Sequence, residues 1–425
     1  MTASIIDSWR GIALDTVATS LTRYYYPMDM EADTSANAVV VPFAGTIQNL
    51  RFLVVTVPSG AGDSSFSIYH NATTDQLSTA FTTTGQKTST GSFSVSAGDT
   101  IIPKAICGGT AGSLSLGWYT FELVPTDTSK CYTYLSANFA SSVARAADGT
   151  TYVVPVGLRE GDATEALTQY KSPIAGTIKY FQVVSGTQQA GSGTSAFTVR
   201  INGATPASSP TVSFATTDDS VVKVDTTNTA TLAVDDLISI EWVISSSTGG
   251  NANFEKFGMW IESTNNEFVL VTADIVGGQR MNVGATYYYG PGGTLNPEGA
   301  TQVEAEVVHT MAFTAKRLHV LSDAEVGTVG SHSVTVLADD GSDTSITLAY
   351  ADAETGWKHD NTNTASFAAD AALSFEITMD AGGTNRDWNC IGIVCAVAAA
   401  STDLEPLLIG GKLVGGGLLL KGLMG

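Results

Sequence analysis

Residues 43–47 read Phe-Ala-Gly-Thr-Ile, residues 174–178 read Ile-Ala-Gly-Thr-Ile, and a weaker third copy at 313–318 reads Phe-Thr-Ala-Lys-Arg-Leu. The copies are 131 positions apart from Gly45 to Gly176, and the third follows after a similar interval. A solenoid unit is much shorter, about 20–50 residues, so each copy marks a whole small domain. The phrase therefore predicts three domains of one fold in tandem.

Each copy precedes a glycine-rich turn and then a strand in which apolar and polar residues alternate, at 66–70, 197–201 and 334–337. Each domain closes on a strand that carries a Trp, at 118–123, 257–261 and 388–393. Short strands separated by turns, without helical periodicity, indicate an antiparallel sandwich. Because a jelly roll and other Greek-key sandwiches both bury alternate residues, periodicity does not separate them.

We therefore predict an all-β chain of three tandem antiparallel, jelly-roll-like β-sandwich domains with an apolar Gly/Leu-rich C-terminal tail. The expected division is an N-terminal arm or short helix at 1–21, sandwich repeats at 22–128, 129–265 and 266–400, and the tail at 401–425. Linkers of only a few residues favour a semi-rigid string of sandwiches with separate cores.

The chain has few charges for its length, and they are mostly acidic. Only 14% of its 425 residues are charged, against a typical value of about 25%, and 41 acids against 20 bases give a net charge of −21. A field of this sign repels nucleic acid and anionic membranes, so neither is an expected partner. The polar surface consists mainly of Ser, Thr, Asn and Gly, which is common in extracellular and virion β proteins.

The four cysteines do not form a disulfide framework. Cys390 and Cys395 are five positions apart in one expected strand, so they face opposite sides and cannot pair with each other. Pairing of Cys107 with Cys131 remains open. The N-terminus lacks the apolar run of a signal peptide, and no apolar stretch of about 18 residues predicts a transmembrane helix.

The last residues differ from the sandwich repeats. The tail contains many glycines, which disfavour a helix, and large apolar residues where a disordered tail is normally polar. An extended segment of this kind suits a groove on another subunit, and packing on the third domain or contact with a membrane are the alternatives. The predicted partner-docking residues are Leu407, Leu408, Ile409, Leu413, Val414, Leu418, Leu419, Leu420, Leu423 and Met424.

No catalytic, cofactor or metal motif stands out. The five histidines lie in no HExxH motif, and neither a Gly-x-Ser-x-Gly elbow nor a GxxxxGK[ST] phosphate loop is present. Residues 339–343, Asp-Asp-Gly-Ser-Asp, offer carboxylates for calcium, but they also separate two expected strands, where Asp-Gly favours a hairpin turn. We favour the turn, and Asp235-Asp236 is interpreted in the same way. We therefore expect no enzyme activity, cofactor or metal.

With its three sandwich repeats, its Ser/Thr/Gly/Ala surface, the missing signal peptide and the apolar terminus, the chain resembles tandem jelly-roll structural proteins of tailed bacteriophage virions. These are capsid decoration, head-fibre and minor virion proteins. The resemblance implies a non-enzymatic virion component, held in the particle by contacts with other virion subunits. It also implies a homo-oligomer such as a trimer, and in some cases contact with a host surface glycan.

Two other classes remain open. One is an extracellular adhesin or array of carbohydrate-binding modules, for which an aromatic-lined groove with polar partners would speak. The other is a polysaccharide-degrading enzyme, which would need two carboxylates facing one cleft, one of them with a raised pKa.

Overall fold

The computed structural model describes most of the chain between residues 6 and 397. The described residues are 6–11, 16–18, 21–25, 38–60, 62–127, 129–138, 145–146, 149–156, 162–186, 193–245, 251–252, 254–263, 265–271, 280–281, 284–291, 305–309, 311–324, 331–339, 341–351, 354–381 and 386–397. They form β-strands and one short 3₁₀ helix, η1 (Glu165–Leu167). The predicted all-β class is confirmed.

The first group of strands forms a two-sheet sandwich, called sandwich 1. One sheet has the order β1-β10-β5-β8 and the other β3-β9-β6-β7, with β2 paired to β10 and β4 to β9. The strands are β1 (Ile6–Gly11), β2 (Thr16–Ala18), β3 (Thr22–Tyr24), β4 (Val39–Val40), β5 (Gly45–Thr56), β6 (Ser64–His70), β7 (Thr74–Phe81), β8 (Gly85–Val95), β9 (Thr100–Ile106) and β10 (Ser113–Pro125). Numbered along the chain, the eight main strands follow the orders 1-8-3-6 and 2-7-4-5, which is the jelly-roll arrangement.

Sandwich 2 repeats this topology. Its sheets are β11-β22-β15-β18 and β13-β20-β16-β17, with β19 and β14 as the additional strands and a separate β12–β21 pair. The strands are β11 (Cys131–Asn138), β12 (Arg145–Ala146), β13 (Gly149–Val153), β14 (Tyr170–Lys171), β15 (Gly176–Ser185), β16 (Thr194–Ile201), β17 (Thr211–Ala215), β18 (Val222–Asp225), β19 (Ala230–Leu232), β20 (Leu237–Ser245), β21 (Asn251–Ala252) and β22 (Phe254–Ser263).

Sandwich 3 has the same order again. Its sheets are β23-β32-β27-β30 and β25-β31-β28-β29, with β24 and β26 added. The strands are β23 (Glu267–Val271), β24 (Arg280–Met281), β25 (Thr286–Tyr289), β26 (Val307–Val308), β27 (Phe313–Ala324), β28 (Ser331–Ala338), β29 (Ser342–Ala351), β30 (Gly356–Phe367), β31 (Ala372–Thr378) and β32 (Arg386–Ala396). No described sheet combines strands from before and after position 128, or from before and after position 265. The domain division at these positions remains our proposal.

The N-terminal segment differs from the expected arm or short helix. Residues 6–11 and 16–18 are strands β1 and β2, and both pair with β10. The closing strand β10 is 13 residues long, so it offers backbone hydrogen bonds to β5 on one side and to both short strands on the other. A segment that can complete a sheet satisfies its backbone groups there, and this outweighs its weak local preference for helix.

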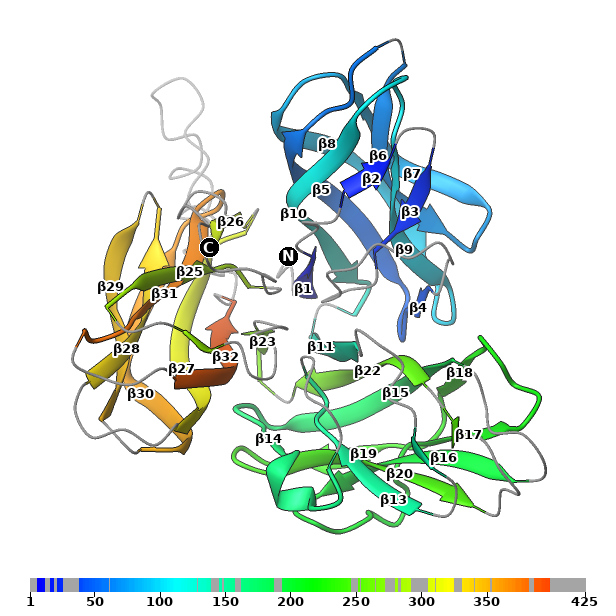
Figure 1. Cartoon of the computed structure of the whole chain (residues 1–425), viewed down its shortest axis with the longest axis vertical. Coiled ribbons are helices and arrows are strands. Elements are labelled where there is room, and N and C mark those ends of the chain that lie inside the picture. Colours follow the sequence, from blue (N-terminus) through cyan, green and yellow to red (C-terminus); the bar gives the residue numbers. More distant parts are fainter. Residues whose placement is uncertain are drawn as a thin grey trace, which may run out of the picture.

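The three sandwiches form a closed ring rather than the string that the short linkers suggested (Figure 1). The first strands β1, β11 and β23 contact one another at the centre, and each sandwich extends outward from them. Short linkers fix the spacing of domains but not their angles. Here the apolar outer faces of the sheets determine the angles, because they are buried against one another.

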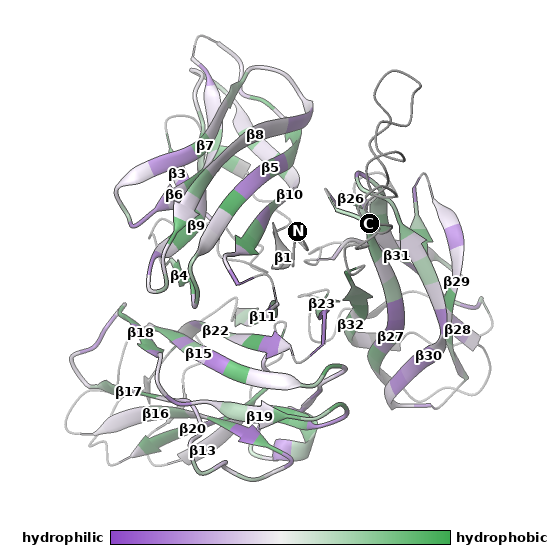
Figure 2. Cartoon of the chain, turned by 180° about the vertical axis from the view of Figure 1, so that it is seen from behind, coloured by the Kyte–Doolittle hydropathy of each residue, from purple (hydrophilic) through white to green (hydrophobic). Residues whose placement is uncertain are grey.

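Each sandwich has its own apolar cluster, and a few side chains of the adjacent sandwich extend that cluster across the junction. Cys390 and Val394 of sandwich 3 belong to the apolar cluster of sandwich 2, and Tyr132 and Trp260 of sandwich 2 belong to that of sandwich 1. Figure 2 shows hydrophobic and hydrophilic residues along the strands that run toward the centre. Strands β10 and β11 are buried on both faces, which only a second packing partner allows.

All four cysteines are buried thiols outside any disulfide, so Cys107 and Cys131 are not linked to each other. Cys390 lies in the cluster of sandwich 2 and Cys395 in that of sandwich 3. The predicted opposite orientation of Cys390 and Cys395 is confirmed.

Candidate functional site

The ten apolar tail residues predicted to dock on a partner, Leu407 to Met424, lie outside the described residues, which end at Val397. The sites that the structure does describe are the three junctions between sandwiches, a half-buried ion network in sandwich 2 and a few acidic turns.

A β-bulge of the same form occurs in each copy of the repeated phrase and positions side chains for contact with the adjacent sandwich. The register against the closing strand slips at Asn49, Tyr180 and Arg317, whose φ angles are 56°, 53° and 55°. Such left-handed conformations are uncommon for residues with a side chain and are characteristic of bulges. The bulge shifts by one residue the alternation of inward-facing and outward-facing side chains. Two positions after the bulge residues, the side chains of Arg51, Gln182 and His319 contact the adjacent sandwich.

At the junction of sandwiches 1 and 2, the side-chain amide of Gln182 forms hydrogen bonds with the backbone in and just before β4. Its Oε1 accepts from the Val40 backbone N–H at 3.0 Å, and its Nε2 donates to the Ala38 carbonyl at 2.8 Å. The indole N–H of Trp260 donates to the Val40 carbonyl at 3.1 Å, and the Trp260 ring packs edge-on against Phe43. Gln182 is only 2% exposed, and these bonds compensate for its buried amide.

At the junction of sandwiches 2 and 3, the equivalent contact is between aromatic rings. The Tyr170 hydroxyl lies 3.1 Å from His319 Nε2, and the Tyr170 ring packs edge-on against Trp357. The Arg317 guanidinium donates to the Pro173 carbonyl at 2.9 Å. Burial, together with nearby His359, lowers the pKa of His319 to about 3, so the imidazole is uncharged near neutral pH.

At the junction of sandwiches 3 and 1, Arg51 pairs with Asp370 at 2.5 Å. Beside this pair Trp118 and Val307 form a small buried apolar cluster, with Leu53 packed against it. Strand β26, which contains Val307, occupies the same position in sandwich 3 as β4 in sandwich 1 and β14 in sandwich 2. Each sandwich thus presents the same edge strand to the next, and the third junction closes the ring.

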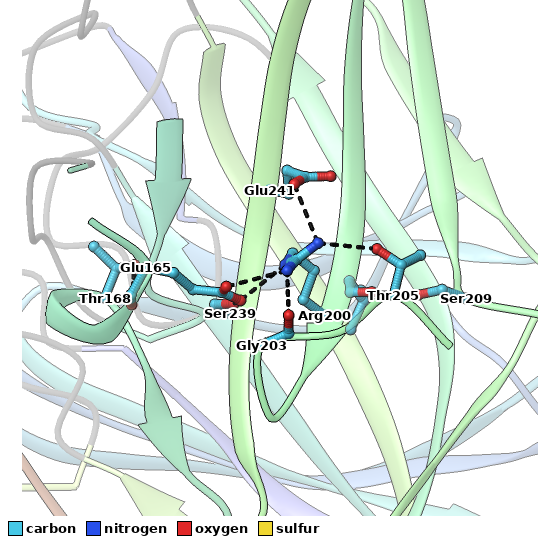
Figure 3. A network of polar contacts seen from close by, with 9 residues as sticks. Glu165, Thr168, Arg200, Gly203, Thr205, Ser209, Ser239 and Glu241 are labelled. Atoms are coloured by element: carbon cyan, nitrogen blue, oxygen red, sulfur yellow. Dashed lines mark hydrogen bonds and ion pairs between the residues drawn. The ribbon is translucent and has the colours of Figure 1, made fainter. Parts of the chain in front are cut away.

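An ion network in sandwich 2 offers the clearest grouping of acidic side chains (Figure 3). Arg200 Nε donates to Glu165 Oε1 at 2.9 Å, and its Nη1 donates to Glu241 Oε1 at 3.2 Å and to Thr205 Oγ1 at 3.1 Å. Ser239 Oγ also donates to Glu165, at 2.6 Å. The network attaches η1 to strands β16 and β20.

The two glutamates do not have the arrangement of a glycosidase pair. Burial raises the pKa of Glu165, but the hydrogen bonds from Arg200 and Ser239 lower it more, so it lies below its usual value. A general acid requires the opposite shift. Both Glu165 and Glu241 bind the same guanidinium, so their role is to hold η1 to the sheet.

The acidic turns also have structural contacts. Asp339 precedes Gly341, whose φ is 81°, in the hairpin between β28 and β29, and its Oδ1 accepts from the Ala372 N–H at 2.7 Å. Asp236 accepts from the Ala233 N–H at 2.7 Å in the turn before β20. Among the described residues, no group of three or more metal-ligating side chains occurs. In the same part of the chain, no helix has the length and apolar character that a membrane crossing requires.

The sequence reasoning missed the junction residues and one further pair of turns. Residues 225–230 and 360–365 share the pattern Asp-x-Thr-Asn-Thr-Ala. The Asp225 carboxylate accepts the backbone N–H groups of Thr227 and Asn228, and Asp360 makes the equivalent bonds in sandwich 3. This shared pattern could have been found in the sequence. No sequence pattern marks Gln182 and His319, because a bulge determines where their side chains point.

No family model matches the chain, and no curated protein matches it either. Several solved structures have a distant likeness, among them the following three. A chain of Sulfolobus Turreted Icosahedral Virus is 10% identical with a TM-score of 0.18, covering 90% of this chain and 91% of its own. A chain from a triple jelly roll and turret assembly of an archaeal virus is 8% identical with a TM-score of 0.18, covering 92% and 91%. Paenibacillus xanthan lyase is 11% identical with a TM-score of 0.19, covering 86% of this chain and 36% of its own. At these values the jelly-roll assignment rests on the strand order described above.

Proposed function

We propose that this protein is a non-enzymatic structural subunit of a virus particle. The observation that carries the proposal is the closed ring of three jelly rolls. Its buried Gln182 and His319 side chains hold sandwiches together, and the half-buried Arg200 holds strands together. A closed ring with buried junctions is a rigid block, and rigid blocks suit repeated assembly.

Composition supports the same proposal. A surface dominated by Ser, Thr, Asn and Gly with a net charge of −21 remains soluble and repels nucleic acid, as suits the outside of a particle. The finer assignment is a capsid decoration, head-fibre or other minor virion protein of a tailed bacteriophage, located in the virion and present as a homo-oligomer. It rests on the resemblance described for the sequence.

We further propose that the tail after Pro406 anchors the ring on another virion subunit. Burying a large apolar side chain stabilises by about 1.5–3 kcal/mol, so half of the ten would contribute several kcal/mol. Ordering the segment costs about 1–2 kcal/mol per residue, so a preformed groove on the partner is needed. Lys412 and Lys421 then belong at the groove rim or beside acidic groups, because burying them unpaired would cancel the gain.

Purified particles test both parts. Mass spectrometry of particles separated on a density gradient should find the chain in a constant ratio to the major shell protein, and its absence from washed particles would overturn the virion assignment. Full-length protein and a form lacking residues 407–425 are then added to particles depleted of the native protein. The full chain should co-sediment and the shortened one should not.

A matched control separates the tail's apolar character from its mere presence. Replacing Leu418, Leu419 and Leu420 by Ser should abolish co-sedimentation, whereas Thr402→Ala, before the docking residues, should leave it nearly unchanged. Equal incorporation of the shortened and full chains would overturn the anchoring proposal while leaving the virion assignment standing.

A further inference from the structure

Two histidines lie next to each other at the junction of sandwiches 2 and 3. The strand register pairs His319 of β27 with His359 of β30, and side chains paired across antiparallel strands have Cβ atoms about 4.5–5.5 Å apart. His319 is fully buried, and the side chain of His359 is 16% exposed. From sandwich 2, the Tyr170 hydroxyl lies 3.1 Å from His319, and a carboxylate oxygen of Asp235 lies 4.0 Å from His359. Both histidines therefore take part in the contact between the two sandwiches.

The packing leaves one buried nitrogen of each ring without a hydrogen bond. In the part of the chain that the structure describes, neither His319 Nδ1 nor His359 Nε2 has a partner. A protonated imidazole is a donor at both nitrogens, so protons on this pair would bury N–H groups that nothing accepts and would place two like charges side by side. The His319 ring has no room to turn toward another acceptor, because a Cβ at Gly392 would lie 2.2 Å from it. The closed junction therefore favours the neutral rings.

The charged groups around the pair do not compensate for an added proton. Two of them are cations, Lys171 from sandwich 2 and Arg317 from the strand of His319. Lys171 pairs with Asp235 at 3.1 Å, and Arg317 shares Glu267 with Lys316. Asp235 is the carboxylate that faces His359, but its side chain is 60% exposed, so solvent screens its charge.

The remaining titratable groups near the junction are bound elsewhere or uncharged. The carboxylates of Asp236 and Asp360 accept hydrogen bonds within their own sandwiches. Burial raises the pKa of the Tyr170 hydroxyl and of the Cys390 thiol, so both remain neutral. No further carboxylate among these groups faces the two rings.

Protons therefore bind better to the open junction than to the closed one. Burial and the neighbouring His359 lower the pKa of His319 to about 3. Burial, followed by the charge of Lys171, lowers the pKa of His359, and Asp235 only partly opposes this. An imidazole in solvent has a pKa of about 6.5. Each pH unit below that value favours opening by up to about tenfold for each histidine, and by up to about a hundredfold for the pair.

The other two junctions have no such pair at the corresponding positions. The strand register places Val224 beside Gln182 at the junction of sandwiches 1 and 2, and Thr88 beside Arg51 at the junction of sandwiches 3 and 1. None of these four side chains changes its charge between pH 7 and 4.5. The other histidines of the chain are His70 in sandwich 1 and His309 and His332 in sandwich 3.

We propose that the junction of sandwiches 2 and 3 is an acid-operated latch, in which protonation of His319 and His359 separates Tyr170 from His319 and opens the junction. The three sandwiches stay folded, and the other two junctions stay closed. The short connection from Ser263 to Glu267 holds sandwiches 2 and 3 together at the centre, so the opening is confined to the outer part of their contact. Protonation of clustered histidines is a common basis for such switches. The latch does not rest on the proposed structural role, and either can fail without the other.

The test measures distances between nitroxide spin labels across two junctions of the full-length protein, by double electron–electron resonance from pH 7 to 4.5. Val234→Cys and Asn361→Cys place one pair at neighbouring positions across the junction of sandwiches 2 and 3. Ala97→Cys and Thr226→Cys, both exposed, place the control pair at corresponding positions of sandwiches 1 and 2. The native cysteines are buried, which limits background labelling.

The latch predicts that acid lengthens the first distance, while the second distance and the circular dichroism of the sandwiches stay constant. A first distance that is unchanged down to pH 4.5 would overturn the proposal. So would a change in both distances together with loss of the circular dichroism signal, because that result means unfolding rather than local opening.

Variants locate the sensor. His319→Gln retains a side chain that can bond to Tyr170 but does not titrate, so the pH dependence of opening should flatten from about a hundredfold to about tenfold per pH unit. His359→Gln, at the less buried position, should flatten it similarly and gives an independent measurement if His319→Gln disturbs the closed junction at pH 7. His70→Gln, which removes a histidine paired with Asp99 in sandwich 1, is the matched control and should respond like the wild type. An acid response that persists when both junction histidines are replaced by Gln would overturn the proposal.

Discussion

The junction of sandwiches 2 and 3 and the junction of sandwiches 3 and 1 place the same strands against each other with different chemistry. In the first, the fully buried His319 and Tyr170 meet ring to ring. In the second, Arg51 pairs with Asp370, whose side chain is 65% exposed, and the burial is supplied by Trp118 and Val307. The fold therefore determines which strands meet at a junction, whereas the side chains that make the contact differ from one junction to the next.

The difference matters because solvent determines what each contact contributes. An exposed ion pair contributes about 0–1 kcal/mol, whereas a buried ring or a buried hydrogen-bonded side chain contributes several times more. The ring should then be held mainly by its buried junctions, and the exposed pair should be dispensable. The predictions below test this order of strengths.

The largest effect is expected from Trp260→Ala at the junction of sandwiches 1 and 2. Trp260 is fully buried, packs against Phe43 and Tyr134, and donates to the Val40 carbonyl. Its removal should lower the free energy of unfolding by about 3–5 kcal/mol, measured by urea denaturation. Hydrogen exchange at β4 should accelerate as well. Val234→Ala, at an exposed position, is the control, and an equal loss in both would contradict the account.

Acid should weaken the junction of sandwiches 2 and 3 through His319. Its pKa is about 3 in the folded chain against 6.5 ordinarily, so the unfolded chain binds the proton first. The contribution of neutral His319 to the free energy of unfolding is therefore fully present above pH 6.5 and is lost as the pH drops toward 3. At about 1.4 kcal/mol per pKa unit, the loss is up to about 4–5 kcal/mol. Urea midpoints measured from pH 7 to 4.5, above most carboxylate titration, should fall in the wild type. A His319→Gln variant should give a flatter profile, and equal slopes would argue against this role.

Gly392→Ala should disturb the same junction by steric contact. A Cβ at Gly392 would lie 2.2 Å from the His319 ring, which cannot withdraw without leaving Tyr170. We expect a loss of about 1–3 kcal/mol, as for overpacking in a core. Gly149→Ala, where a Cβ meets nothing within 4 Å, is the matched control. If Gly392→Ala is as stable as that control in thermal unfolding, the close packing at this junction is wrong.

The smallest effect is expected for Arg51→Ala. Its partner Asp370 is largely exposed, so the loss should be at most about 1 kcal/mol and should shrink at high salt. Asp370→Asn should behave alike, and the double variant should lose little more than either alone. A loss comparable to that of Trp260→Ala would reverse the proposed order of strengths.

Much of the fold could be predicted from the sequence because its strands alternate. The repeated phrase falls on β5, β15 and β27, and the Trp-bearing closing strands are β10, β22 and β32, as expected. The jelly-roll order could not be separated from other sandwiches, because alternation shows which face is buried and not which strand lies alongside.

The ring was not foreseen, although its signal is present in the sequence. Residues 116–123 read Leu-Gly-Trp-Tyr-Thr-Phe-Glu-Leu, and 131–137 read Cys-Tyr-Thr-Tyr-Leu-Ser-Ala, with large apolar side chains on both faces. A strand that is apolar on both faces needs a second layer to cover it. Arg317 was missed for another reason: it reaches the adjacent sandwich only because a bulge turns the strand there.

The contact that closes the ring joins residues 319 positions apart, and it gives the most direct test of the account. Cysteines are placed by Arg51→Cys and Asp370→Cys, and the dilute monomer is treated with a short bismaleimide. The four native cysteines are buried, which limits background labelling. The closed ring predicts an intramolecular link between the peptides containing positions 51 and 370, and a protein carrying only separate modifications at the two positions would contradict it.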